Sequence, residues 1–167
     1  MGLDMYLSAR KHIDKIDWKL IDRNYDSEQR YEIATTKEYK DVIEAADMQN
    51  ISKHNEIYGV DVSVNVAYWR KDNQIHNWFV DNVQDGEDNC REYYVSQDKL
   101  QELLATCRSA YSAKDPSELM PVEGFFFGGT DIDDYYWQGV KDTIDKLDEI
   151  VNFPDFDKLS FYYQSSW

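Results

Sequence analysis

The side chains best suited to hold a ligand gather in residues 68–79, YWRKDNQIHNWF. If this segment is a helix, Trp69, Asn73 and His76 fall on one stripe, because positions i, i+4 and i+7 share a helix face. There the tryptophan could stack on a ligand, a neighbouring cation could hold an anion, and the amide and imidazole could orient it. Arg70 stands out, because its planar fork suits a phosphate or carboxylate bidentately. The candidate ligand-binding residues are Trp69, Arg70, Lys71, Asn73 and His76.

The same helix would carry a second stripe, formed by Ile75, Phe79 and Val83, which we expect to face the core. A helix with two filled stripes has more large or specific groups than one core face needs, which favours a ligand site. The structural alternative is that the tryptophan and histidine pack against neighbouring loops and that the arginine pairs with one of the many acids. The sequence leaves both interpretations open.

A second concentration of charge lies in residues 131–152, which we expect to form the last helix. The aspartates at its start could hold Mg²⁺ or Ca²⁺, which prefer oxygen ligands. Their spacing matches no EF-hand loop, and acids at a helix N-terminus also complement the helix dipole. We therefore predict no metal site, and instead an acidic surface that a basic protein could contact. Its candidate residues are Asp131, Asp133, Asp134, Asp142, Asp145 and Glu149.

Catalytic signatures are missing from the sequence. It holds no nucleophile elbow GxSxG, no phosphate loop GxxxxGK[ST], no dinucleotide fingerprint GxGxxG and no zinc motif HExxH. Its three histidines, His12, His54 and His76, lie far apart, and none has a second metal ligand at i+4. The sequence therefore favours a non-catalytic protein without a cofactor, although a site built from distant elements stays open.

The net charge bears on the choice of partner. The chain of 167 residues carries 33 acidic and 18 basic side chains, a formal net charge of −15. Such a field repels nucleic acid and anionic membranes and attracts basic proteins. The plainer interpretation is that acidity keeps a chain with 15% aromatic residues in solution. No run approaches the roughly 20 apolar residues that span a bilayer, so we predict neither direct nucleic-acid binding nor membrane insertion.

The cysteines indicate the compartment. Cys90 and Cys107 show neither CxxC nor zinc spacing, and the N-terminus has no signal-peptide pattern. Two free thiols in a reducing cytosol are the simplest interpretation, so we expect a cytoplasmic protein.

The elements that would position these groups indicate a single α+β domain over residues 1–167. We expect a mixed or antiparallel sheet covered mainly on one face by helices. Period-two alternation is clearest over residues 60–68, which predicts a strand with one apolar face. The residues of that strand expected in the core are Val60, Val62, Val64 and Val66. The other expected strands are residues 3–9, 30–35, 93–96, 124–129 and 158–166.

Helical spacing of apolar residues predicts three further helices. A capping box of Thr35 and Glu38 should start the first, which runs to Ala46. Ser96 should cap the second and Thr130 the third. The expected buried faces are Leu100, Leu103, Leu104 and Cys107 in the second, and Tyr136, Val140, Thr143, Leu147 and Val151 in the third. We expect irregular chain or loops over residues 14–29, 48–59, 81–89 and 112–121.

Blocks of sequence that stand apart are MGLDMYL at the start, YWRK with N, IH and WF in the centre, GFFFG, and YYQSSW at the end. Together they resemble a family of small proteins found in bacteriophages and bacterial genomes, and they are spread over the whole chain. This sequence has Asp72 and Gln74 inside the central block, where smaller residues are expected. The resemblance implies a setting, a phage or mobile-element accessory protein in a bacterial host cytoplasm. It implies no catalytic residues.

Two functions follow as hypotheses. In the first, the protein is a non-catalytic accessory protein that binds a host protein with a basic surface, for example as an acidic inhibitor of a nucleic-acid-processing or defence enzyme. In the second, it binds or acts on an anionic small molecule such as a nucleotide, through the side chains of Trp69, Arg70, Asn73 and His76. A continuous acidic patch would favour the first hypothesis, and a closed pocket lined by those side chains would favour the second.

Overall fold

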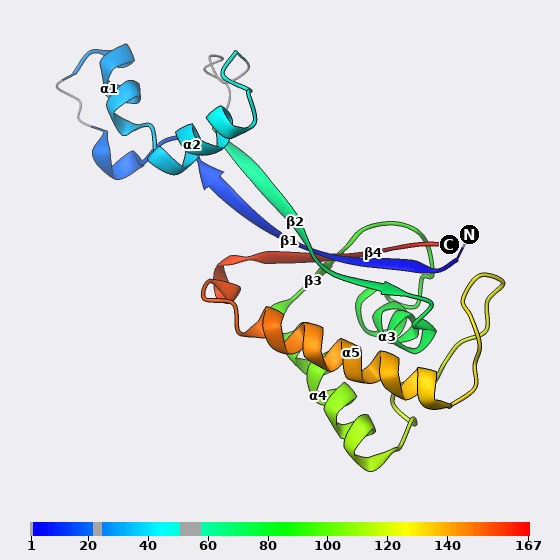
Figure 1. The fold of residues 1–167 in the computed structure, drawn as a ribbon. Helices are drawn as coiled ribbons and strands as arrows, with labels where there is room; N and C mark the ends of the chain where they lie inside the picture. Colours follow the sequence, from blue (N-terminus) through cyan, green and yellow to red (C-terminus); the bar gives the residue numbers. More distant parts are fainter. Residues whose placement is uncertain (1, 22–24, 51–57) are drawn as a thin grey trace. The chain divides into compact units, whose positions relative to one another are not determined.

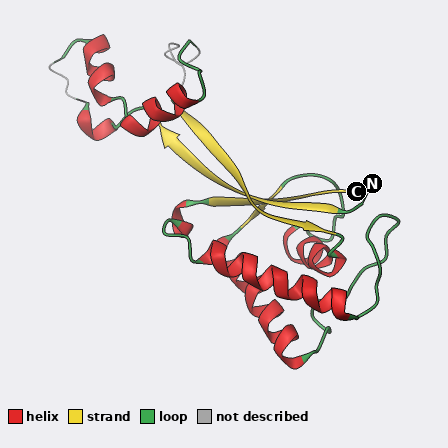
Figure 2. Cartoon of the chain, in the orientation of Figure 1, coloured by secondary structure: helices red, strands yellow, loops and turns green. Residues whose placement is uncertain are grey.

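A computed structural model describes residues 2–21, 25–50 and 58–167. The fold is α+β, as predicted, and its helices and strands are drawn in Figures 1 and 2. In chain order they are β1 (Asp4–Asp14), the short 3-10 turn η1 (Trp18–Leu20), α1 (Ser27–Ala34), α2 (Lys37–Ala45), β2 (Gly59–Arg70), α3 (Asn73–Val83), β3 (Tyr93–Val95), α4 (Gln97–Ala113), α5 (Asp134–Val151), the 3-10 turn η2 (Phe156–Lys158) and β4 (Ser160–Ser166).

The chain divides into two compact units, Met1–Arg10 with Ser63–Trp167, and Lys11–Val62. In the second unit, Thr36 donates a hydrogen bond to the carbonyl oxygen of Asp14 at 2.7 Å, and a β-bridge joins Ile16 to Thr35. All of the residues discussed below as a site belong to the first unit. The single domain that we predicted over residues 1–167 stays a prediction beside this division.

The sheet is antiparallel, with strand order β2-β1-β4-β3. Its register places Met5 opposite Ser165 and Leu7 opposite Tyr163, and all four side chains are buried. Helices α3, α4 and α5 lie on this side of the sheet, as Figure 1 shows. The core of the first unit therefore lies between one sheet face and three helices, as predicted for a sheet covered on one face.

The strand over residues 60–68 is present, but its predicted core face is wrong. Val64 is 56% exposed, whereas Ala67 and Trp69 are buried beneath the helices. Side chains alternate along a strand, so burial of positions 67 and 69 turns Val64 toward the other face. Val60, Val62 and Val66 are half-buried rather than buried, and Val66 packs against the core. The alternation of valines does not identify the core face, because the uncovered face of this sheet is also rich in apolar and aromatic residues.

That uncovered face carries a row of tyrosines. The rings of Tyr6 and Tyr68 lie 5.3 Å apart, and those of Tyr94 and Tyr162 lie 5.8 Å apart. The guanidinium of Arg10 lies 4.1 Å from the centre of the Tyr162 ring. Cross-strand aromatic pairs of this kind stabilise a sheet, which explains why β-forming residues occupy a face that no helix covers.

Helices α4 and α5 match the sequence prediction most closely. The predicted faces are buried in both helices, apart from Val151, which is half-buried. Ser96 caps α4, as predicted, by accepting a hydrogen bond from the amide of Lys99. The cap of α5 is Asp133, not Thr130, and accepts from the amide of Tyr136 at 3.1 Å. An ionised aspartate is the stronger cap, because it also complements the helix dipole.

Two predicted strands are wrong. Residues 30–35 mostly belong to α1, because the Asp26 side chain accepts hydrogen bonds from the amides of Glu28 and Gln29 and so starts a helix. Residues 124–129 form turns rather than a buried strand, and Phe125 is 95% exposed. Gly128 has a φ of 98°, which breaks an extended run.

Other predicted boundaries are partly displaced. Helix α2 is capped by Thr36, one residue after the predicted cap, and does not use the capping box of Thr35 and Glu38. The irregular segment over residues 14–29 and the loop over residues 48–59 lie partly outside the described residues. Among the residues that are described, no helix is long and apolar enough to cross a membrane.

Candidate functional site

The segment over residues 68–79 is not one helix. Strand β2 continues to Arg70, Lys71 adopts a left-handed φ of 62°, and α3 begins at Asn73. This break overturns the predicted stripe, because a strand residue and a helix residue do not share a helix face. Ile75 and Phe79 lie in the core with no exposed surface, as predicted.

Three of the predicted ligand-binding residues are buried structural groups. The indole Nε1 of Trp69 donates to Thr143 Oγ1 at 3.0 Å. The amide Nδ2 of Asn73 donates to the carbonyl oxygens of residues 127 and 129, at 3.2 Å and 2.8 Å. His76 lies between the hydroxyl of Tyr163, at 2.8 Å, and Asp88 Oδ1, at 3.1 Å. Their nitrogen donors and the imidazole are engaged with the protein, although Asn73 Oδ1 is buried without a partner, and none of the three lines the cavity described next.

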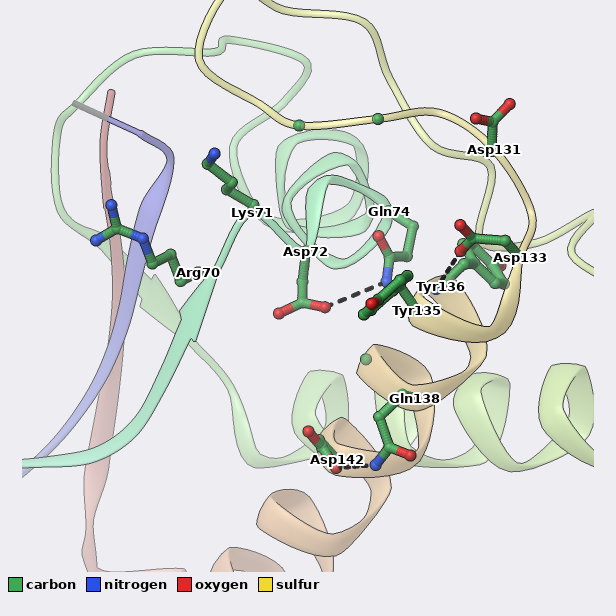
Figure 3. Close-up of a pocket in the computed structure, with 13 residues that line it drawn as sticks. Arg70, Lys71, Asp72, Gln74, Asp131, Asp133, Tyr135, Tyr136, Gln138 and Asp142 are labelled. Atoms are coloured by element: carbon green, nitrogen blue, oxygen red, sulfur yellow. Dashed lines mark hydrogen bonds between the residues drawn. The ribbon is translucent and has the colours of Figure 1, made fainter.

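Arg70 and Lys71 do line a cavity, which has a volume of about 510 Å³. Its wall also includes the turn into α3, the loop over residues 128–133 and the first half of α5 (Figure 3). The guanidinium of Arg70 is exposed and forms an ion pair with Asp4 at 3.1 Å. The strongest predicted anion-binding group therefore already has a carboxylate partner.

Asp72 stands at the centre of this cavity wall (Figure 3). It occupies the N-cap position of α3, yet its side chain makes no capping hydrogen bond. Instead the half-buried carboxylate lies toward α5, and Oδ1 accepts a long hydrogen bond of 3.5 Å from Gln74 Nε2. Burial raises the pKa of Asp72, and nearby Asp142 raises it further, while Lys146 and Gln74 act in the opposite direction.

Gly139 makes room for this carboxylate. A Cβ atom built on Gly139 would lie 2.0 Å from Asp72 Oδ1, so any other residue would displace Asp72. Glycine inside a helix costs about 1 kcal/mol relative to alanine, and an aspartate that does not cap forgoes about 1 kcal/mol. A glycine inside a helix and an aspartate that does not cap its helix each lower the stability of the fold, and here they are in contact. Such locally unfavourable residues are typical of a functional site.

The remaining acids of the cavity are also free of ion pairs. Among residues 2–21, 25–50 and 58–167, no lysine, arginine or histidine nitrogen forms a salt bridge with Asp72, Asp131, Asp133 or Asp142. Asp142 accepts a hydrogen bond of 2.6 Å from Gln138 Nε2. The cavity therefore has four carboxylates against two cationic side chains, one of which is already paired.

The predicted acidic surface is divided by the structure. Asp131, Asp133 and Asp142 line the cavity. Asp134, Asp145 and Glu149 are exposed but do not line it, and Asp145 is paired with Lys141 at 2.6 Å. The described residues contain no group of three or more histidine, cysteine, aspartate or glutamate side chains placed to hold a metal ion. The arrangement suits an organic cation, whose charge and donors are spread over several atoms.

Sequence reasoning missed Asp72, Gln74 and Gly139. A usable signal was the glycine in the middle of an otherwise regular amphipathic helix, which often marks a close approach of another group. A second was the pair Asp72-Asn73, since both residue types favour turns and helix starts over helix interiors.

Comparisons of the chain with protein-family models, with curated proteins and with solved structures gave no match. The function of the site is therefore inferred from its lining residues, their charges and their contacts.

Proposed function

We propose that this protein is a non-catalytic accessory protein, of phage or mobile-element type, that binds a host protein with a basic surface. The acidic cavity beside α5 is the proposed contact. The net charge of −15 supports the proposal, because its field attracts basic partners. The blocks of sequence that resemble small phage proteins support the setting, and an inhibitor of a nucleic-acid-processing or defence enzyme in the bacterial cytoplasm fits both.

The observation that carries the proposal is the placement of Asp72. Its carboxylate is half-buried, forms no salt bridge among the described residues and lies near Asp142, whose charge opposes its ionisation, although Lys146 acts in the opposite direction. A desolvated carboxylate near a second carboxylate is costly to keep ionised. A cation from a partner would remove that electrostatic cost. Its removal would contribute to the free energy of binding.

The surroundings of the cavity favour a protein over a small ion. Tyr135, which lines the cavity, is 86% exposed, and Ile132 and Phe125 in the preceding loop are also exposed. Exposed aromatic residues near a desolvated charge are the usual composition of a protein–protein hot spot.

The alternative function, binding of an anionic small molecule, has less support. Its predicted site consists of Trp69, Arg70, Asn73 and His76. Arg70 lines the cavity but is paired with Asp4, and the other three are buried and do not line it. The cavity itself holds more acids than bases, which opposes an anion.

Capture of partners from a bacterial host lysate tests the proposal. Wild-type protein should capture a basic protein, and raising the salt concentration should weaken the association sharply, because exposed charges are screened over about 8 Å at physiological ionic strength. Asp72→Asn should reduce capture at least about tenfold, whereas Asp81→Asn should not. Asp81 is an exposed acid in α3, the helix that Asp72 precedes, and it does not line the cavity, so this control removes the same charge elsewhere.

A stability measurement makes the result interpretable. The pKa of Asp72 is raised, so its favourable contribution to folding exists below the unfolded value of 3.8 and is lost as the pH rises through the raised pKa. Asp72→Asn should therefore not lower the stability at neutral pH. Equal capture by wild type and Asp72→Asn, or capture that is insensitive to salt, would contradict the proposed function.

A further inference from the structure

The geometry of the cavity points to one chemical group as its occupant. We infer that the cavity binds a guanidinium, supplied by an arginine side chain of the partner. This inference rests on the proposed function, and it adds the identity of the recognised group.

Gln74 gives an observation independent of the acidic residues. Its side chain is only 4% exposed, yet it lines the cavity. Nε2 is directed to Asp72, which fixes the orientation of the amide and leaves Oε1 as the free atom. Within the described part of the chain, Oε1 accepts no hydrogen bond. Because Gln74 lines the cavity, a hydrogen-bond donor in the cavity could bind Oε1, which would be a neutral acceptor beside the carboxylates.

The acceptors of the cavity form a set that a guanidinium can satisfy. Asp72 offers its carboxylate, Gln74 offers Oε1, and Asp142 keeps Oδ2 free because Gln138 occupies only Oδ1. Arginine presents five N–H donors in one plane and suits carboxylates bidentately. An ammonium group has three donors around one atom, and a metal ion needs ligands gathered closely around one point, which the described acids do not provide.

The charges in the cavity and the exposed ring of Tyr135 both favour a guanidinium as the occupant. Asp142 raises the pKa of Asp72, so the two carboxylates repel each other when the cavity is empty. A delocalised cation near both removes that repulsion without having to shed the tight hydration shell of an ammonium ion. The exposed ring of Tyr135 lines the same cavity, where an aromatic face can stack on a guanidinium.

Arg70, the arginine among the residues that line the cavity, does not fill this role. Arg70 lines the cavity, but its guanidinium is paired with Asp4 and contacts the hydroxyl of Tyr68. We therefore assign the occupant to another molecule.

Titration of the isolated protein with N-acetyl-arginine methylamide, followed by NMR, tests the inference. Backbone amides of Gly128, Gly129 and Gly139 should shift, since these glycines line the cavity. Asp72→Asn should weaken binding at least about tenfold, and Gln74→Met should weaken it severalfold while preserving side-chain length. Asp81→Asn should leave binding unchanged. The citrulline analogue, which has the same shape without the charge, should not bind, and the lysine analogue should bind more weakly than the arginine probe.

The outcomes separate this inference from the proposed function. Equal binding of the arginine and lysine probes, or equal binding to wild type and Asp72→Asn, overturns the guanidinium assignment. If no probe shifts the glycine amides while lysate capture still depends on Asp72, the guanidinium assignment fails and the protein-binding function stands. If the arginine probe binds but no basic protein is captured, the proposed function fails and the guanidinium site stands.

Discussion

Replacing Gly139 by alanine tests whether the Asp72 carboxylate really occupies the space above α5. The new Cβ atom would lie 2.0 Å from Asp72 Oδ1 and 3.1 Å from Gln74 Nε2. Alanine gains about 1 kcal/mol over glycine inside a helix, while forcing a buried group aside costs about 1–3 kcal/mol. Gly139→Ala should therefore change the free energy of unfolding by between about zero and about −2 kcal/mol, instead of raising it by about 1 kcal/mol.

The same change should have the opposite effect once Asp72 is shortened. In an Asp72→Ala background only the flexible end of Gln74 remains close to position 139, so Gly139→Ala should raise the free energy of unfolding by up to about 1 kcal/mol. The two backgrounds should differ by about 1–3 kcal/mol, a coupling typical of residues in contact. Gly129→Ala is a control for adding a methyl group beside the cavity outside α5, because a Cβ there would meet no atom within 4 Å.

Urea unfolding followed by circular dichroism measures all four proteins of this double-mutant cycle. The slope of the free energy with denaturant should stay constant, which shows that the native fold is retained. If Gly139→Ala stabilises by about 1 kcal/mol in both backgrounds, Asp72 does not lie over Gly139, and the account of the cavity given above is refuted.

Two further predictions follow from the sheet and from the buried histidine. Val64→Asp should change the stability by no more than about 0.5 kcal/mol, because Val64 lies on the uncovered sheet face; Leu7→Asp, on the covered face, should unfold the protein, and thermal melting of the pair distinguishes the two faces. Burial lowers the pKa of His76 below 6.5, although Asp88 acts to raise it, so its contribution to stability should be complete above pH 6.5 and fall as the pH drops toward the lowered pKa. Unfolding titrations from about pH 8 to about pH 5 should show this slope in the wild type and a reduced slope in His76→Gln; equal slopes would contradict it.

Regular elements could be predicted where one periodicity dominated. Leu100, Leu103 and Leu104 recur at helical spacing, and burial of that face in α4 needs nothing beyond this pattern. The strand over residues 60–68 was equally clear, but its face was not. Period two shows which residues share a face, and only the tertiary fold decides which face the helices cover. Here small Ala67 and large Trp69 lie under the helices, whereas Val64 is exposed and Val66 is only partly buried against the core.

The candidate site depended on a boundary that the pattern does not reveal. The apolar spacing of residues 68–79 is compatible with one helix, and the left-handed turn at Lys71 moved Trp69 into a strand. That shift of a few residues separated Trp69 from His76 and brought Asp72 and Gln74 to the cavity instead. Arg70 and Lys71, beside the break, were the predicted residues that the cavity retained.

Asp72 and Gly139 also set a direction for evolutionary drift. A chain that no longer needs the cavity can replace Asp72 without loss of stability, and only then does alanine at position 139 become favourable. The return path must first restore glycine in the middle of α5, at a cost of about 1 kcal/mol, before the carboxylate can return. Loss of the site therefore needs two substitutions in a fixed order, neither of which lowers the stability of the fold. Recovery of the site must begin with a substitution that does lower it.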